Sequence, residues 1–365
     1  MLRKIGENLH FALTILLAIG LVPALLAAKL PIRFDWPRLL ETFWLGLNIQ
    51  SVFFASLLYI ICFPIRETIQ PLWRRYWNQK VRFLILFLLF VQLYLLFGLT
   101  AFLFLSVVAV AILELAERTR NQPGGFGRAL FSFLIPATYW FIGLFLVFIL
   151  NQAVIAVRPH RANDAVLNRL DSWILFGATV SELAHKAFTA LPLMLYRFLD
   201  LLYFAMFAQA GGALIIIGLR IGRERALQFV ATVLTAGYIA LAIYFLWPSL
   251  SPFYTCPAHF EILPKALLSY SVQQQLLAYV TLLREGGKLG EIGTGYFIAF
   301  PCMHIATPVV ALWFLRQWRR LAVTLLGLDI LLCAAIVLLE YHYVVDLIGG
   351  VAVAALAIAM VDGRE

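Results

Sequence analysis

The sequence predicts an all-α fold, a polytopic transmembrane helical bundle of nine or ten spans. Its composition is 63% apolar and only 13% charged, whereas soluble domains are about 45 to 50% apolar and about 25% charged. The apolar residues occur in repeated blocks of about 20, the length that a helix needs to cross ~30 Å of hydrocarbon. The alternating polarity of transmembrane strands is missing. A water-soluble globular protein, a disordered chain and a membrane β-barrel are therefore excluded.

Taken in order, the predicted spans are residues 9–28, 43–63, 83–113, 137–157, 198–219, 226–247, 301–318, 321–339 and 344–361. The first block continues into further membrane segments without a small-residue cleavage site, so we expect a retained span and not a signal peptide. The block at 83–113 is too long for one upright helix and short for two, so it is a tilted helix or a hairpin. We expect residues 1–136 to hold transmembrane helices of unknown role and residues 137–365 to form the functional core.

Basic residues in short loops orient the predicted spans. Because Lys and Arg mark cytoplasmic loops, we expect the turns at 220–225 and 316–320 to be cytoplasmic and segments 158–171 and 248–300 extracytoplasmic. The loop at 64–82 carries five basic residues and is cytoplasmic only if block 83–113 is a hairpin. A net charge of +9 distributed in this way suits anionic lipid headgroups and not nucleic acid. The short loops favour a multi-pass protein of a bacterial inner membrane.

Two stretches are too polar to span. Residues 168–195 mix aromatic and charged side chains, which predicts an interfacial or re-entrant helix. Residues 248–300 are expected to cap a site on the extracytoplasmic face. The four cysteines show no CxxC pair, so neither a zinc site nor a disulfide framework is indicated, and only Cys256 and Cys302 form a plausible pair. His160, His185 and His259 are expected in loops or at the interface.

Ionisable side chains at the starts of two spans are the candidates for chemistry. On a helix, His342 and Asp346 would lie one turn apart, so that Asp346 accepts the Nδ1 proton and leaves Nε2 as a nucleophile. The segment from Pro301 descends about 27 Å and the next span climbs about 30 Å back, so His304 and His342 return to one level. We expect two imidazoles and one carboxylate to converge there.

This arrangement suits phosphoryl transfer through a phosphohistidine, with the second histidine moving a proton. A GxSxG elbow for acyl transfer is missing, and Cys302 does not face His304 from two residues away on a helix. A metal site of His304, His342 and Asp346 and a purely structural hydrogen bond between helices are the alternatives. The prediction assigns no metal and no cofactor.

The motifs support a specific family. Pro301-x-x-His304 and His342-x3-Asp346 followed by Leu-Ile-Gly-Gly resemble the C-terminal motifs of the type-2 phosphatidic acid phosphatase superfamily. The run from Tyr341 to Gly350 is most similar to its phosphotransferase branch, the inositol phosphorylceramide synthase and sphingomyelin synthase enzymes. The resemblance covers residues 137–361 and implies a six-helix catalytic core.

The resemblance also implies roles. His342 would be the nucleophile, Asp346 would orient it, and His304 would protonate the leaving alkoxide and later deprotonate the acceptor. Arg158, with Arg161 as a helper, would bind the phosphate.

Asp171 is a candidate for hydrogen bonding to a polyol such as inositol. Helix capping is the alternative use of Asp164 and Asp171.

The chain departs from the phosphatases of that superfamily, which carry K-x6-R-P, P-S-G-H and S-R-x5-H-x3-D. Asn151 stands at the Lys position, Cys302 and Met303 replace Ser-Gly, and Ile336 replaces the last Arg. A phosphodiester carries one negative charge and a phosphomonoester between one and two, so a cation-poor pocket favours the diester. Cations from the segment 248–300 are possible substitutes.

The sequence therefore predicts a lipid phosphotransferase. It would move a phospho-headgroup, phosphoinositol in the first instance, from a phospholipid donor to ceramide or a similar lipid alcohol acceptor and release diacylglycerol. The alternatives are a lipid phosphate or polyprenyl diphosphate phosphatase, and a transporter or scaffold without enzymatic activity. The oligomeric state is left open.

Overall fold

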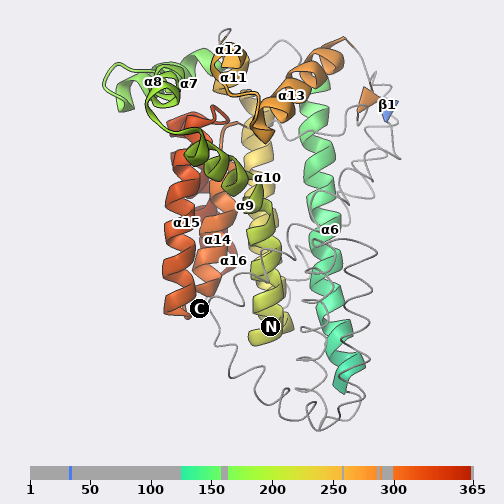
Figure 1. Ribbon diagram of the computed structural model, residues 1–365. Coiled ribbons are helices and arrows are strands. Elements are labelled where there is room, and N and C mark those ends of the chain that lie inside the picture. The colour runs from blue at the N-terminus through green and yellow to red at the C-terminus, as the bar shows by residue number, and fades with distance from the viewer. Residues whose placement is uncertain are drawn as a thin grey trace, which may run out of the picture.

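The computed structural model describes residues 33–34, 125–157, 163–256, 259–285, 288–289 and 299–362 (Figure 1). The spans predicted at 9–28, 43–63 and 83–113 lie outside these residues. The basic loop at 64–82 lies outside them as well.

Helices make up nearly all of the described part. The longer ones are α6 (Gly125–Val157), α9 (Leu193–Arg220), α10 (Arg223–Leu246), α14 (Met303–Leu315), α15 (Arg319–Leu338) and α16 (Val344–Val361). The shorter ones are α7 (Asp164–Ile174), α8 (Val180–Ala190), α11 (Pro252–Thr255), α12 (His259–Ile262) and α13 (Leu268–Arg284). Two-residue strands β1 (Arg33–Phe34) and β2 (Lys288–Leu289) pair in parallel. The predicted helical fold class is confirmed for these residues.

Four helices of the described part are long and apolar enough to cross a membrane: Ile135–Val154 within α6, α10, α15 and α16. The two halves of α9, Leu193–Phe204 and Gln209–Gly218, meet at 50° and would make a fifth as one bent span, while α14 has 13 residues. The start of α16 matches the prediction. α6 starts well before residue 137, so the expected boundary between 136 and 137 falls inside a continuous helix.

The long helices pack side by side around α10, which contacts α6, α9, α14 and α16, while α15 packs on α9 and α14 (Figure 1). Aromatic side chains fill the contacts. Phe229 of α10 is fully buried, stacks on Trp140 of α6 at 5.9 Å between ring centroids, and meets Phe314 of α14 edge to face at 5.5 Å. Such geometries are preferred by aromatic pairs and fix how the helices face each other.

The short helices α7, α8, α11, α12 and α13 gather at one end of the bundle (Figure 1). Along α7, Asp164, Leu167 and Asp171 point inward and are buried, whereas Trp173 and the following Phe176 are exposed. The stretch predicted as one interfacial or re-entrant helix is thus two short helices joined by a turn. The exposed aromatic side chains are suited to the polar–apolar boundary of a bilayer.

The other end of the bundle holds the basic turns. Arg225 at the start of α10 forms an ion pair with Asp362 at the end of α16, and Trp313 Nε1 of α14 donates to the same carboxylate at 2.6 Å. Arg316 lies over the Trp313 ring at 3.7 Å. The two basic turns therefore share one end, as the sequence predicted, and it is the end away from α7 and α8.

Candidate active site

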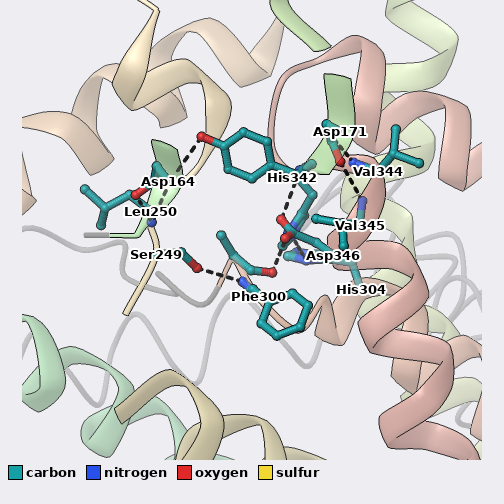
Figure 2. A network of polar contacts seen from close by, with 12 residues as sticks. Asp164, Asp171, Ser249, Leu250, Phe300, His304, His342, Val344, Val345 and Asp346 are labelled. Carbon is teal, nitrogen blue, oxygen red and sulfur yellow. Dashed lines mark hydrogen bonds and ion pairs between the residues drawn. The ribbon is translucent and has the colours of Figure 1, made fainter. Parts of the chain in front are cut away.

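Two histidines meet where α14 begins and α15 ends. His304 lies in the first turn of α14, and His342 lies in the connection between α15 and α16. His304 Nδ1 and His342 Nε2 are 2.9 Å apart (Figure 2). The predicted hairpin, which returns the chain to the level of its start, is confirmed by this contact.

Asp346 contacts His342 as predicted, but not across a helical turn. α16 begins at Val344, so His342 precedes the helix and Asp346 lies in its first turn. Asp346 Oδ2 lies 3.2 Å from His342 Nδ1 and accepts a hydrogen bond of 2.9 Å from the backbone N–H of Tyr343. One carboxylate therefore caps the helix and orients the imidazole at once.

The hydrogen-bond partners of His342 and His304 show which ring nitrogen of each carries a proton. His342 Nδ1 lies 2.9 Å from the carbonyl oxygen of Ala299, which can only accept, so Nδ1 carries the proton. In neutral His342 the lone pair then resides on Nε2, and the facing Nδ1 of His304 donates to it. With both imidazoles neutral, His304 Nε2 is left as a hydrogen-bond acceptor. The nucleophilic nitrogen predicted from the sequence points at the second histidine.

Tyr203 of α9 completes this series of hydrogen bonds and was not predicted. Its hydroxyl lies 3.0 Å from His304 Nε2 and donates to that acceptor. Its buried ring stacks on Tyr341 at 3.9 Å and on His304 at 5.0 Å. A tyrosine within an apolar block carries no sequence signal of this kind, because hydropathy does not tell which face of a span points inward.

Burial keeps His342 neutral. It lowers the pKa of His342 from 6.5 to about 4, although the hydrogen bond to Ala299 acts in the opposite direction. An imidazole in this environment holds its Nε2 lone pair at neutral pH, which is what a nucleophile needs.

Two aspartates of α7 hold the start of α16. The carboxylate of Asp171 accepts from the backbone N–H groups of Val344 at 2.7 Å and Val345 at 2.8 Å (Figure 2). Asp164 accepts from Leu250 N–H and from the Tyr343 hydroxyl, and burial raises its pKa to about 6. Of the two, Asp171 has the capping use, at the start of α16, whereas Asp164 accepts from a loop N–H and a hydroxyl and caps no helix. Polyol binding by Asp171 stays a prediction.

Glu340 anchors the other side of the reactive connection. Its backbone is left-handed, with φ at 57°, and its side chain is buried. Glu340 Oε1 lies 3.0 Å from His259 Nδ1, and Oε2 accepts from the Ser181 hydroxyl at 2.7 Å. His259 is fully buried, which differs from the loop or interfacial place expected for it. The described start of the segment 248–300 lies over this end, because Phe253 N–H donates to the Glu340 carbonyl.

A close approach between α14 and α16 fixes the distance between the histidines. Cys302 N–H donates to the Asp346 carbonyl at 3.0 Å. A Cβ added at Gly350 would lie 2.3 Å from the Cys302 carbonyl oxygen. Only glycine fits at this position, which explains a residue of the motif that has no chemistry of its own.

Other predicted features have different outcomes. Arg158 and Arg161 lie outside the described residues. Asn151 and Ile336, at the positions of the two missing cations, are both fully buried. Cys256 and Cys302 are free thiols, so the plausible disulfide is not formed.

The apolar helices and the contact between His304 and His342 at one end of the bundle are those of an integral membrane protein with a histidine-based site. The chain belongs to the PAP2 superfamily, whose model matches residues 165–360, more than half of its length. Searches of curated proteins and of solved structures gave no significant match. The resemblance to the type-2 phosphatidic acid phosphatase superfamily is therefore confirmed at the level of the superfamily. Its members act on lipid phosphates as phosphatases or phosphotransferases, in keeping with a membrane-embedded enzyme.

Proposed function

We propose that the protein is a lipid phosphotransferase that moves a phospho-headgroup, phosphoinositol in the first instance, from a glycerophospholipid to ceramide or a similar lipid alcohol. The observation that carries the proposal is the neutral His342 whose Nε2 lone pair faces His304 at 2.9 Å. A nucleophile and a proton carrier at this separation can act on the same phosphorus and its leaving oxygen. We also propose that bent α9 and short α14 complete a six-helix core with the four long helices.

In the first half-reaction, His342 Nε2 attacks phosphorus and the bond between phosphorus and the glycerol oxygen breaks. His304 gives a proton to that oxygen, and diacylglycerol leaves. As the substrate binds, His304 takes up a proton from water, and the anionic phosphate favours the resulting imidazolium, which this step needs. Asp346 and the Ala299 carbonyl hold the Nδ1 proton of His342 throughout.

In the second half-reaction, His304 takes the proton of the acceptor hydroxyl, whose oxygen attacks phosphorus while the N–P bond to His342 breaks. A new phosphodiester forms and both histidines return to their starting states. The site lies among buried aromatic side chains, which would restrict water as a competing acceptor.

The residues at two positions that are cationic in the phosphatases support the diester over the monoester. Ile336 and Asn151 occupy two positions that are cationic in the phosphatases of the superfamily, and both are fully buried. A second negative charge on the substrate would therefore have fewer partners at these positions. Arg158 and Arg161 are proposed to bind the single charge of the diester, and Asp171 to face the headgroup.

The position of the site supports its proposed orientation. The basic turns, including Arg225, lie at the end of the bundle away from the histidines. Since basic turns favour the cytoplasm, we propose that the site faces the extracytoplasmic side of the membrane, in a bacterial inner membrane.

A phosphatase is the second candidate, because the superfamily includes both activities. The test is a detergent-micelle assay of the full chain with fluorescent ceramide and phosphatidylinositol, and with phosphatidate or a polyprenyl diphosphate offered separately. Label should move to a phospho-headgroup ceramide with the wild type and not with His342→Ala. Release of phosphate from either phosphate substrate without transfer would refute the transferase. A wild type inactive with every substrate would favour the transporter or scaffold.

A further inference from the structure

Three metal-binding side chains converge at the reactive end of α14. One ligand atom each from Cys302, His304 and His342 lies within 4.8 Å of the other two. Cys302 and His342 are buried, and His304 is half-buried, which leaves the cluster an accessible edge. The set differs from the one the sequence suggested, since Asp346 lies on the Nδ1 side of His342, opposite the nitrogen that faces His304. The expectation that Cys302 does not face His304 was wrong, because Cys302 precedes α14 as its N-cap and is not inside the helix.

We infer that Cys302, His304 and His342 form a binding site for a soft divalent cation such as Zn²⁺, and that occupation of this site blocks the nucleophile. One thiolate and two imidazoles are the donor set that Zn²⁺ takes in sites with three protein ligands and one open position. Mg²⁺ and Ca²⁺ prefer oxygen ligands and are not expected to bind.

The cation requires the sulfur, which lies within 4.8 Å of both nitrogens, to approach them by at most about 1.2 Å. Zn–N bonds of ~2.1 Å and Zn–S bonds of ~2.3 Å at tetrahedral angles place two nitrogens about 3.4 Å apart and a sulfur and a nitrogen about 3.6 Å apart. The two histidine nitrogens, now 2.9 Å apart, would separate by about 0.5 Å as the hydrogen bond between them gives way to the metal.

Binding of the cation displaces one proton. The Cys302 thiol loses its proton to the buffer and binds as thiolate, and His342 binds through its Nε2 lone pair. His304 moves its proton from Nδ1 to Nε2, where the Tyr203 oxygen accepts it, and binds through Nδ1. The Nδ1–H of His342 keeps its bond to Ala299, the outer partner that a metal-bound imidazole usually has.

Binding can be tested without activity, by adding Co²⁺ to the metal-free full-length protein in detergent. We expect one cobalt per chain, with the absorption of a tetrahedral site and a thiolate-to-cobalt charge-transfer band that Zn²⁺ removes. Cys302→Ser should lose the band and weaken binding at least about tenfold, since even loss of an outer partner costs a metal site 10- to 100-fold. A chain with Cys62, Cys256 and Cys333 replaced by Ser keeps Cys302 alone and should retain the band.

The outcomes separate cleanly. A wild type without the thiolate band overturns the inference, as does a band that survives in Cys302→Ser or disappears from the chain with Cys302 alone. Unfolding of Cys302→Ser would not hide the result, because the wild type and the single-cysteine chain are each tested directly.

Inhibition is a second readout, and only this one rests on the proposed function. Zn²⁺ should inhibit phosphotransfer, EDTA should restore it, and Mg²⁺ should have no effect. Cobalt binding without inhibition of an active enzyme would overturn the claim that the bound cation blocks His342. If the protein has no phosphotransferase activity, the absorption spectra still decide whether the cation site exists.

Discussion

Replacing Tyr203 with Phe tests the assignment of protons in the active site. The change removes one hydroxyl, which donates to His304 Nε2 at 3.0 Å, and keeps the ring that stacks on Tyr341 and His304. When His304 becomes protonated during the reaction, the bond reverses and Nε2–H donates to the tyrosine oxygen. The hydroxyl thus stabilises the charged form of His304 more than the neutral form.

The size of the effect follows from this difference. A neutral hydrogen bond contributes about 1 kcal/mol, and one to a charged group about 1.5 to 3 kcal/mol. The difference of about 0.5 to 2 kcal/mol acts in the second half-reaction, where His304 gains its charge as it takes the acceptor proton, so kcat should fall about 2- to 30-fold. KM should change little, because substrate binding is not expected to involve Tyr203.

The assay compares kcat and KM of Tyr203→Phe with those of Tyr196→Phe. Tyr196 lies on the same helix, is buried and stacks on Phe188, and its hydroxyl has no hydrogen-bond partner in the described part of the chain. The control therefore loses the same atom without touching His304. A Tyr203→Phe enzyme within twofold of the control would refute the proton assignment. A kcat as low as that of His304→Ala would show that Tyr203 does more than hold a tautomer.

Three further predictions concern His342 and the start of α16. With the pKa of His342 at about 4, single-turnover phosphorylation should persist at pH 5.5, where about 97% of this imidazole is neutral against about 9% of one with a pKa of ~6.5. A phosphorylation rate that falls by half near pH 6.5 would contradict the neutral state expected of His342 at pH 5.5. Because unfolded His342 binds a proton at a higher pH than folded His342, thermal stability should fall as the pH drops from ~6.5 to about 4. Gly350→Ala should lower the free energy of unfolding by about 1 to 3 kcal/mol through its clash with Cys302, whereas Gly327→Ala, with open space around it, should leave melting unchanged or raised. Asp171→Asn should cost about 0.5 to 2 kcal/mol of stability and lower kcat with KM within twofold, and a large rise in KM alone would favour headgroup binding.

The sequence predicted those contacts of the site that depend on the spacing of residues along neighbouring segments. The apolar blocks on either side of the turn near Arg319 have similar lengths, so the chain had to bring His342 back to the level of His304. The contact of His342 with Asp346 was predicted from helical spacing, yet the structure forms it at a helix start. His342 precedes α16 and Asp346 lies in its first turn. The same spacing of four residues therefore brings them together, although the backbone at His342 is not helical.

The contacts missed by the sequence join distant segments. Tyr203 meets His304 across 101 residues, and Ser181 meets Glu340 across 159. Hydropathy predicts the depth of a span but not its rotation, so it does not tell which polar side chains of two spans face each other. His259 was missed for a related reason, because a histidine in a polar connection gives no sign of being fully buried.

The cap on α16 also bears on how the protein is made. Asp171 leaves the ribosome long before Val344 and Val345, which lie 173 and 174 residues later. Until the final span enters the bilayer, the carboxylate of Asp171 lacks these partners and His342 lacks Asp346. A nascent chain therefore lacks an oriented nucleophile during biosynthesis. His342 Nε2 reaches its active orientation only when insertion of the bundle is nearly finished.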